Sequence, residues 1–363
     1  MNAYEELAVR LRDGDSPVRI VGGRTKIGWG RLAGDMVELS TSSLDEILEH
    51  NEGDLTAVLQ AGVPIARAQE KFAEANQMLA LDPPDLGGAT IGGIVAAADS
   101  GPLRHRYGAA RDLVLGVAVA LPDGTVARAG GKVIKNVAGY DLGKLFAGSF
   151  GTLGAIVEVA VRLHPMRPTA SAEGHGSDPA KVAAAAQALA HSRLEAQALD
   201  IAWRGGRGGV LVRFAGSEAE PQAEAARREL EQAGLEASVM HDDHAAWEAQ
   251  RVAQRGDLVV RVSALQSRLG DVLAAAERMG GGVVGRAALG ICWVSLPADA
   301  GADGVTRLRT ELAPSMCVVL DAPDEVRAEI DPWGFERGGA LELMRSVKQR
   351  FDPAGLLAPG LLA

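Results

Sequence analysis

The length, composition and charge of the chain exclude several classes of protein. At 363 residues it is too long for one ordinary small domain, so two or three lobes are expected. Its 47% hydrophobic and 23% charged residues are typical of a soluble globular protein, and no apolar run approaches the roughly 20 residues that span a bilayer. The net charge of -10 argues against a nucleic-acid partner.

The amino terminus and the cysteines predict the cellular setting. Residues 1–6 are partly acidic and lack the basic-then-apolar order of a signal peptide. Cys292 and Cys317 lie in apolar runs with no nearby metal-type ligand, so buried free thiols are expected rather than disulfides or an iron-sulfur site. These features predict a cytoplasmic protein without direct membrane insertion, whose only membrane contact would come through partner subunits.

The first half of the chain alternates short apolar runs with segments of helical spacing. The pattern predicts strands at 18–21, 36–39, 56–60 and 113–121, and helices at 43–50 and 65–76. A buried strand is expected at 155–163, after which Pro165 and Pro168 mark a boundary. This half therefore predicts an α+β lobe.

The second half repeats a strand-helix-strand alternation twice. Helices are expected at 179–191, 218–233, 265–279 and 302–312, and strands at 210–214, 258–262, 282–284, 290–296 and 317–320. We interpret this pattern as two ferredoxin-like halves that form one antiparallel sheet. The tail from residue 338 is a helix ended by Asp352 and Pro353, followed by a short return stretch.

A glycine-rich loop follows the first predicted strand. It contains Gly22, Gly23, Thr25 and Lys26, but Trp29 and the residues after it start no convincing helix. A Rossmann turn needs that helix, which makes a nicotinamide-dependent enzyme a weak alternative. Successive backbone N–H groups here would form an anion nest, while an ordinary glycine-rich hairpin is the structural alternative.

A second glycine loop, at 87–93, leads into a run of small residues at 94–98 that starts a helix able to pack close to a ligand. Two glycine loops in one lobe, each with a threonine, favour a diphosphate ligand more than either loop does alone. A third cluster, at 100–108, gathers Arg104, His105 and Arg106 in an otherwise acidic chain. It is expected to attract an anionic substrate, to stabilise a reduced flavin, or to serve as a solvated basic loop.

Four ordered motifs resemble the FAD-binding domain of the vanillyl-alcohol-oxidase superfamily, also called PCMH-type. They are Gly22-Gly23-Arg24-Thr25-Lys26, Gly88-x-Thr90-x-Gly92-Gly93, Tyr107-Gly108-x-x-Arg111-Asp112 and Gly148-Ser149-x-Gly151-Thr152-Leu153-Gly154. The stretches 131–142, 331–334 and 351–355 resemble the FAD-binding (E) subunits of glycolate oxidases. The resemblance implies a two-lobed PCMH-type domain at 1–168, a ferredoxin-like cap with an antiparallel sheet at 169–325, and a C-terminal segment at 326–363 that returns to the FAD domain.

The resemblance also implies FAD as the cofactor and assigns residues to it. The loop 22–28 and the segment 90–93 would hold the pyrophosphate, and 151–157 would lie against the adenine or ribose. Many relatives tether the flavin through a histidine in the first loop, where this chain has Arg24 and Thr25, so noncovalent FAD is expected. The cofactor-binding residues expected in this way are Gly22, Gly23, Arg24, Thr25, Lys26, Gly88, Thr90, Gly92, Gly93, Ser100, Tyr107, Gly108, Asp112, Gly151, Gly154 and Ile156.

Two departures from the family pattern affect the predicted chemistry. Ala358 stands where the terminal motif usually has asparagine, and the histidine-rich metal motif of relatives that oxidise 2-hydroxy acids is absent from the sequence. His241 and His244 flank Asp242 and Asp243, but this stretch is typical of a polar loop and helix cap, so no metal site is predicted. The base that takes the substrate proton is then expected on another subunit.

The predicted function is oxidation of a small 2-hydroxy acid such as glycolate within a complex. The resemblance implies a metal-bearing flavoprotein subunit and an iron-sulfur subunit as partners. No catalytic residue is assigned, and the candidates are Arg104, His105, Arg106, Lys132 and Lys135. A self-sufficient FAD-dependent 2-hydroxy acid dehydrogenase and a scaffold subunit with a vestigial flavin site stay open as alternatives.

Overall fold

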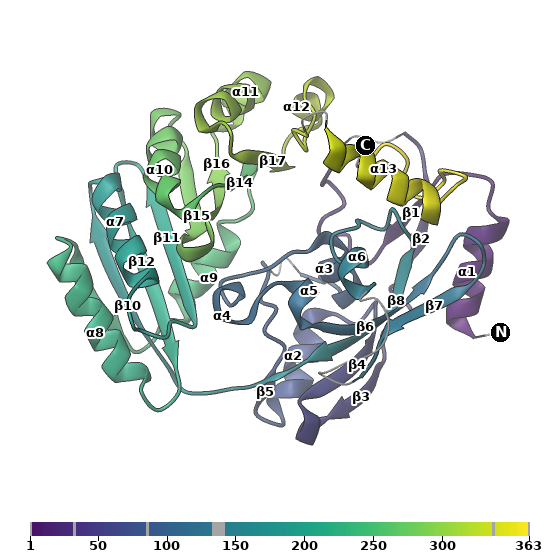
Figure 1. The fold of residues 1–363 in the computed structure, drawn as a ribbon, viewed down its shortest axis with the longest axis horizontal. Coiled ribbons are helices and arrows are strands. Elements are labelled where there is room, and N and C mark those ends of the chain that lie inside the picture. The colour runs from purple at the N-terminus through teal and green to yellow at the C-terminus, as the bar shows by residue number, and fades with distance from the viewer. Residues whose placement is uncertain (1, 32–33, 85–86, 133–141, 336–337, 362–363) are drawn as a thin grey trace.

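The computed structural model describes residues 2–31, 34–84, 87–132, 142–335 and 338–361. They form two lobes that lie side by side (Figure 1). The amino-terminal lobe contains the first nine strands, and the cap contains all strands from residue 169 to residue 321. The fold is α+β, as predicted, although the exact boundaries of the lobes stay a prediction.

The amino-terminal lobe is built on a five-stranded antiparallel sheet in the order β3-β4-β8-β6-β7. Its strands are β3 (Ile47–Asn51), β4 (Thr56–Gln60), β6 (Val114–Ala120), β7 (Val126–Gly130) and β8 (Ala155–Arg162). Beside it, β1 (Val18–Val21) and β2 (Val37–Ser40) form a separate parallel pair. The predicted strands at 18–21, 36–39, 56–60, 113–121 and 155–163 are thereby confirmed to within a residue or two.

The helix predicted at 43–50 is wrong. Residues from Ile47 onward form β3, which pairs antiparallel with β4 through Ile47 and Leu59 and through Asn51 and Thr56. The helical spacing of apolar residues was real, but edge pairing with β4 satisfies the backbone groups of this segment and overrides local propensity.

The helices of this lobe cover both faces of its sheet. They are α1 (Ala3–Asp13), α2 (Ile65–Ala73), α3 (Ile91–Ala97), α4 (Arg104–Tyr107), α5 (Ala110–Leu113) and α6 (Gly143–Phe146). A capping box between Asn2 and Glu5 starts α1, whose buried face packs with Val157 and other residues on one face of the sheet. The main core, which includes Phe72, Ile94 and Val159, fills the other face.

The cap is one eight-stranded antiparallel sheet made from two β-α-β-β-α-β units, which confirms the ferredoxin-like interpretation. The first unit contains β10 (Thr169–Gly176), α7 (Pro179–Ala190), β11 (Ala198–Arg204), β12 (Arg207–Ala215), α8 (Ala219–Gln232) and β13 (Glu236–Met240). The second contains β14 (Val259–Ser263), α10 (Leu269–Arg278), β15 (Gly282–Arg286), β16 (Ile291–Ser295), α11 (Gly301–Leu312) and β17 (Met316–Asp321). The second strands of the two units, β11 and β15, pair and join them.

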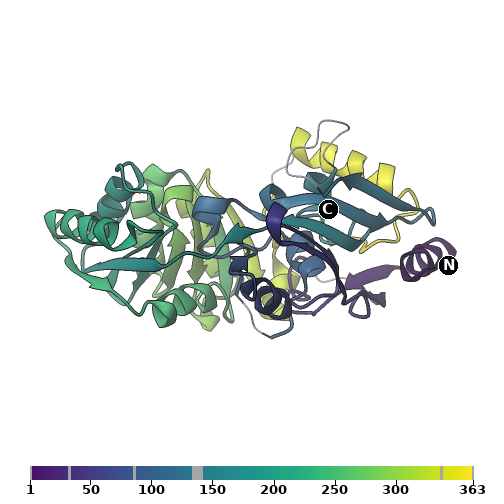
Figure 2. The ribbon, with the colours of Figure 1, turned by 90° about the horizontal axis from the view of Figure 1, so that it is seen from below.

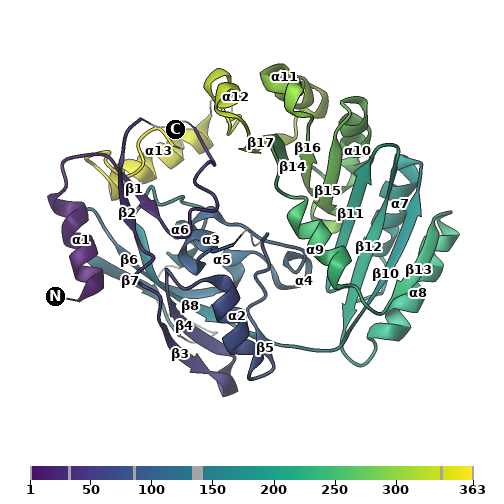
Figure 3. The same cartoon turned by 180° about the vertical axis from the view of Figure 1, so that it is seen from behind.

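The two faces of the cap sheet have different neighbours. The four helices α7, α8, α10 and α11 lie on the outer face, over a core that includes Val212, Val260 and both buried free cysteines, Cys292 and Cys317 (Figure 2). The inner face meets α9 (His244–Val252) and the amino-terminal lobe (Figure 3). Because side chains alternate along a strand, every second residue of β11, β14, β15 and β16 points toward that lobe.

The C-terminal segment returns to the amino-terminal lobe. After α12 (Asp324–Glu329), the helix α13 (Gly339–Phe351) lies across that lobe, with the Phe351 ring 5.6 Å from that of Phe146. The chain then runs beside β1, where the Val18 N–H donates to the Leu356 carbonyl oxygen at 2.8 Å. Within the described residues, no helix combines the length and the apolar character needed to cross a membrane.

Candidate functional site

A cleft opens at the end of β1 and extends between three segments of the amino-terminal lobe, with about 790 Å³ of empty space that includes the part open to solvent. The segments are the loop after β1, the start of α3, and the stretch from Phe150 to β8, with Leu361 of the C-terminal segment closing one side. The lining includes Gly22, Gly23, Arg24, Thr25, Lys26, Thr90, Gly92, Gly93, Gly151, Gly154 and Ile156.

The loop after β1 is shaped by its contact with the loop before α3. A Cβ atom on Gly23 would lie 1.6 Å from the Gly88 carbonyl oxygen, and one on Gly22 would lie 2.3 Å from Thr90 Oγ1. Both positions therefore need glycine, because Gly23 lies against the backbone of Gly88 and Gly22 lies against the side chain of Thr90. Thr90 caps α3, with its hydroxyl oxygen accepting from the Gly93 N–H at 3.4 Å.

Arg24 and Lys26 leave this loop in opposite directions. Arg24 adopts a left-handed backbone conformation with φ of +60° and forms an exposed ion pair with Glu38. Lys26 turns inward, where its Nζ lies 3.0 Å from Asp99 Oδ2, with the two side chains only 8% and 5% exposed. The loop thus contributes two ion-paired cations to the lining of the cleft, a buried Lys26 and an exposed Arg24.

The cap contacts the same loop through a second ion pair. Arg255 donates from Nε and Nη2 to Asp321 at 2.7 and 2.8 Å, and from Nη1 to the Thr25 carbonyl oxygen at 3.1 Å. The Trp29 indole N–H donates to Asp321 Oδ1 at 2.9 Å, and the Arg255 guanidinium lies 5.2 Å from the Trp29 ring centre. The wall of the cleft is therefore fastened to the cap.

Eleven of the sixteen residues predicted to bind the cofactor line this cleft, and five do not. The Gly88 carbonyl oxygen lies against Gly23 of the loop after β1, and Ser100 is buried beside Asp99. Tyr107 and Asp112 line a different hollow, where Asp112 accepts from the Ala109 N–H at 2.9 Å and Gly108 turns the chain with φ of +84°. Ser100, Tyr107, Gly108 and Asp112 thus lie outside the lining of the cleft, and their contacts with a cofactor stay a prediction.

The catalytic candidates are spread over different surroundings. Arg104 is half-buried between the lobes and donates to Ser100 Oγ at 3.3 Å. Burial and the charge of Arg106 lower the pKa of His105, whose Nδ1 is buried with no partner among the described residues. Arg106 pairs with Glu195 at 3.4 Å and Lys132 pairs with Glu49, both at the surface, while Lys135 lies outside the described residues.

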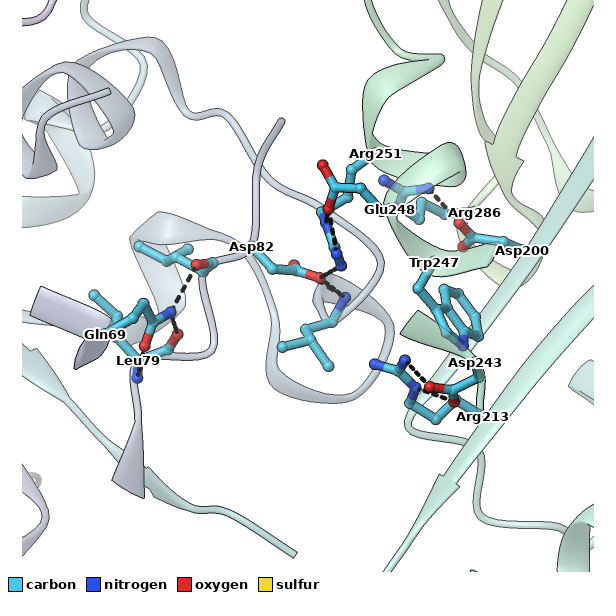
Figure 4. Close-up of polar contacts among 12 residues, drawn as sticks. Gln69, Leu79, Asp82, Asp200, Arg213, Asp243, Trp247, Glu248, Arg251 and Arg286 are labelled. Carbon is cyan, nitrogen blue, oxygen red and sulfur yellow. Dashed lines mark hydrogen bonds and ion pairs between the residues drawn. The ribbon is translucent and has the colours of Figure 1, made fainter. Parts of the chain in front are cut away.

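A polar seam of four charged residues lies between the lobes and was not predicted from the sequence (Figure 4). It consists of Asp82, Asp200, Arg251 and Arg286. Asp200 and Arg286 form an ion pair with both side chains 0% exposed, and Asp82 reaches across to Arg251 at 3.9 Å. Asp82 also accepts from the Leu103 N–H at 3.1 Å. The aspartates stand in separate apolar stretches, and only the docking of the lobes brings them together.

Burial dominates the titration of both seam carboxyl groups. It raises the pKa of Asp200 to about 7, with Arg286 opposing the rise and the charge of Asp82 adding to it. Burial also raises the pKa of Asp82 to about 6, against the charges of Arg286 and Arg251. Loss of water around a carboxylate outweighs a nearby guanidinium here, as expected when the group is removed from solvent.

In the stretch 241–244, Asp243 stands at the N-cap position of α9, but its side chain accepts no hydrogen bond from the helix backbone. Asp243 precedes α9 and accepts two hydrogen bonds from Arg213, at 2.7 and 2.9 Å, and one from Ser171 at 2.5 Å. Across the ranges that the structure describes, no group of three or more histidine, cysteine or acidic side chains is placed to hold a metal ion.

Comparison with known proteins shows which family the amino-terminal lobe resembles. Residues 6–130 match the family model of the FAD binding domain. The chain resembles the chitooligosaccharide oxidase structure with a TM-score of 0.70 and 15% identity, covering 100% of this chain and 90% of that one. An alkyldihydroxyacetonephosphate synthase structure also gives a TM-score of 0.70, at 14% identity, covering 98% and 75%. These two likenesses show the fold alone, and residues 6–130 are similar to the FAD binding domain family.

Three curated relatives narrow the resemblance. Glycolate oxidase subunit GlcE of Escherichia coli is 37% identical over 158 residues, which cover 43% of this chain and 44% of that protein. Glycolate oxidase subunit GlcD of Bacillus subtilis is 40% identical over 126 residues, covering 35% and 27%. D-2-hydroxyglutarate dehydrogenase of Stutzerimonas stutzeri is 37% identical over 143 residues, covering 39% and 31%. The predicted resemblance to glycolate oxidase subunits is confirmed, and each match spans less than half of the relative's length.

Proposed function

We propose that the chain binds FAD noncovalently in the cleft at the end of β1 and serves the oxidation of a small 2-hydroxy acid such as glycolate. The observation that carries this proposal is the coincidence of the cleft with the matched FAD-binding domain. Eleven residues expected to contact the cofactor converge there from three segments. The names of relatives that act on glycolate and on 2-hydroxyglutarate support the substrate class.

The residues of the cleft suit a dinucleotide. Gly22, Gly23, Gly92 and Gly93 leave backbone without side-chain bulk along one wall, which allows close approach of a diphosphate to main-chain N–H groups. The loop 22–28 contains neither histidine nor cysteine, the residue types expected as covalent tethers, so the cofactor is held by contacts alone.

The chemistry divides between cofactor and protein. When bound, FAD would accept a hydride from the C2 carbon of the substrate. The chain's own part is to bind and orient: the cleft loops would position the cofactor, and Arg255 of the cap holds the loop after β1 through the Thr25 carbonyl oxygen. Trp29, which lines the cleft, packs in an apolar cluster that also contains Trp293 and Trp333.

We further propose that the chain works as one subunit of a complex with a metal-bearing flavoprotein subunit and an iron-sulfur subunit. The likeness to two differently named glycolate oxidase subunits supports a multi-subunit assembly. Rapid glycolate oxidation by the isolated chain with an artificial electron acceptor would instead make it a self-sufficient dehydrogenase.

The visible spectrum of the purified protein, followed by acid precipitation, tests the cofactor. We expect a flavin spectrum and release of FAD into the supernatant. Yellow colour that stays in the pellet would contradict the noncovalent assignment. A colourless protein that does not bind added FAD would overturn the proposed function and favour a scaffold role.

A further inference from the structure

A second hollow, which we call the cap slot, lies between α9 and the inner face of the cap sheet (Figure 3). It has about 930 Å³ of empty space, which includes the part open to solvent. The cap slot shares no lining residue with the cleft at the end of β1, and residues 6–130 contribute nothing to it. It is therefore a hollow of the cap alone.

The two broad walls of the cap slot carry little side-chain bulk. On the sheet, Gly209 of β12 pairs with Ala202 of β11, and both line the slot. On the helix, the lining includes Ala246, Ala249 and the C-cap residue Ala253, whose spacing of three and four positions places them on one face. Empty space between packed elements forfeits van der Waals contacts, and a flat ring between these two walls would restore them.

The helix wall also contains a buried amide without a partner. Gln250 lines the cap slot and is only 7% exposed. Its Oε1 is buried and accepts no hydrogen bond from any residue that the structure describes. A buried amide oxygen that lacks a donor costs free energy, so native structures usually give it a partner. A ligand with an N–H or O–H group would supply the missing donor.

A guanidinium group stands at the edge of the cap slot. Arg204 of β11 extends over Gly282 of β15, where an added Cβ would lie 2.8 Å from Arg204 Nε. It donates to Ser295 Oγ at 2.7 Å, and no carboxylate among the described residues pairs with it. The acidic residue of the lining, Glu173, lies on β10 and pairs with His175 at 3.0 Å. The exposed Arg204 thus keeps N–H groups for an anion.

We infer that the cap slot binds a small aromatic carboxylate that carries an N–H or O–H group on its ring. The ring would lie between the alanines of α9 and the small residues of the sheet, the donor would reach Gln250, and the carboxylate would pair with Arg204. A mostly apolar hollow with a few polar groups that fix the orientation is the usual form of a small-molecule site. This inference goes beyond the proposed function, because the site belongs to the cap and needs neither FAD nor a 2-hydroxy acid.

Two probes of similar shape separate the contacts of the ring from those of the donor. Indole-3-acetate has a ring N–H group and a carboxylate, whereas 1-naphthaleneacetate keeps a fused ring and the carboxylate but has no N–H group. Binding of each probe to the purified full chain is measured by calorimetry and by thermal stabilisation at constant ionic strength. Cyclohexaneacetate, whose ring is not flat, is titrated in parallel.

Three variants address the three contacts. Ala249→Leu fills the slot from α9, and Ala245→Leu is its matched control, because Ala245 is exposed on the same helix and outside the lining. Gln250→Met removes the amide and keeps a similar length. Arg204→Met removes the guanidinium, and Arg278→Met, at an exposed position of α10, is the control for charge.

We expect the parent to bind indole-3-acetate about tenfold more tightly than 1-naphthaleneacetate, as one hydrogen bond to a buried acceptor would give, and cyclohexaneacetate more weakly than either. Gln250→Met should remove the preference between the two aromatic probes. Arg204→Met and Ala249→Leu should each weaken both aromatic probes by at least about tenfold, while the two control variants bind as the parent does. Without a ligand, Gln250→Met should melt at the temperature of the parent or above it, because burial of an unpartnered amide is unfavourable.

Three binding results would overturn the inference. They are the absence of saturable binding of either aromatic probe to the parent, an equal affinity in Ala249→Leu and Ala245→Leu, and an unchanged preference for indole-3-acetate in Gln250→Met. A melting temperature that falls in ligand-free Gln250→Met would also count against it, because the amide would then stabilise the fold rather than wait for a ligand.

Discussion

At the scale of single residues, Gly23 determines whether the two loops of the cleft can meet. An added Cβ would lie 1.6 Å from the Gly88 carbonyl oxygen, and this oxygen is backbone that cannot rotate away. We expect Gly23→Ala to destabilise the fold by about 1 to 3 kcal/mol and to weaken FAD binding by at least about tenfold. FAD titration and thermal melting measure both effects. Gly53→Ala is the control, because a Cβ at that exposed position meets nothing within 4 Å. Equal FAD affinity in both variants would argue against this contact.

The raised pKa of the single residue Asp200 predicts that the stability of the fold depends on pH. Its folded pKa of about 7 lies above the ordinary aspartate value, so the folded chain binds a proton that the unfolded chain has already lost. The stabilisation is complete below the unfolded pKa and is lost as the pH rises to about 7. Asn cannot titrate, so we expect the free energy of unfolding of the parent to fall by about 2 kcal/mol more than that of Asp200→Asn between pH 5 and 8. Urea unfolding of both proteins at both pH values measures this difference. An equal change of the unfolding free energy with pH in the two proteins would contradict the prediction.

At the scale of elements, Asp352 anchors the C-terminal segment. Its buried carboxylate accepts from the Leu357 N–H at 2.7 Å and the Leu356 N–H at 3.1 Å, and it pairs with Lys348 of α13. Without it, three donors lose their partner and the segment that carries Leu361 to the cleft loses its anchor. We expect Asp352→Ala to cost about 1 to 3 kcal/mol and to expose the chain beyond residue 352 to proteases. Limited proteolysis with mass spectrometry detects the cut. The exposed Glu342→Ala in the same helix should leave the pattern unchanged.

At the scale of the whole molecule, Arg255 joins the cap to the cofactor loop. Its bonds to Asp321 within the cap and to Thr25 across the lobes are partly buried, with side chains 15% and 13% exposed for the ion pair. We expect Arg255→Met to weaken FAD binding by about tenfold although no part of the cap lines the cleft. The exposed Arg278→Met, which loses only a surface pair with Glu311, is the control for charge. An unchanged FAD affinity would show that the cap does not order the loop.

Much of the fold could be predicted from local patterns, with instructive exceptions. The repeated strand-helix alternation after residue 169 predicted both halves of the cap sheet because each unit follows its own periodicity. The helix predicted at residues 43–50 was wrong because β3 is an edge strand. Its conformation depends on pairing with β4 rather than on its own sequence. Tyr107 and Asp112 of the motif at 107–112 line a different hollow from the cleft, which the motif could not reveal, since a motif does not say which way its side chains point.

By itself, the sequence determined the α+β class and the two glycine loops, because backbone freedom and hydrophobic period are local properties. The expectation that these loops bind FAD came from the resemblance of their motifs to a known family. Only the tertiary structure decided which charges meet between the lobes. Asp82, Asp200 and Arg286 are separated by more than eighty residues from one another in the chain, and Asp82 and Arg251 lie on different lobes. Their pairing, burial and shifted pKa values arise from docking one lobe against the other, and solvent exclusion at that contact has no counterpart in local sequence.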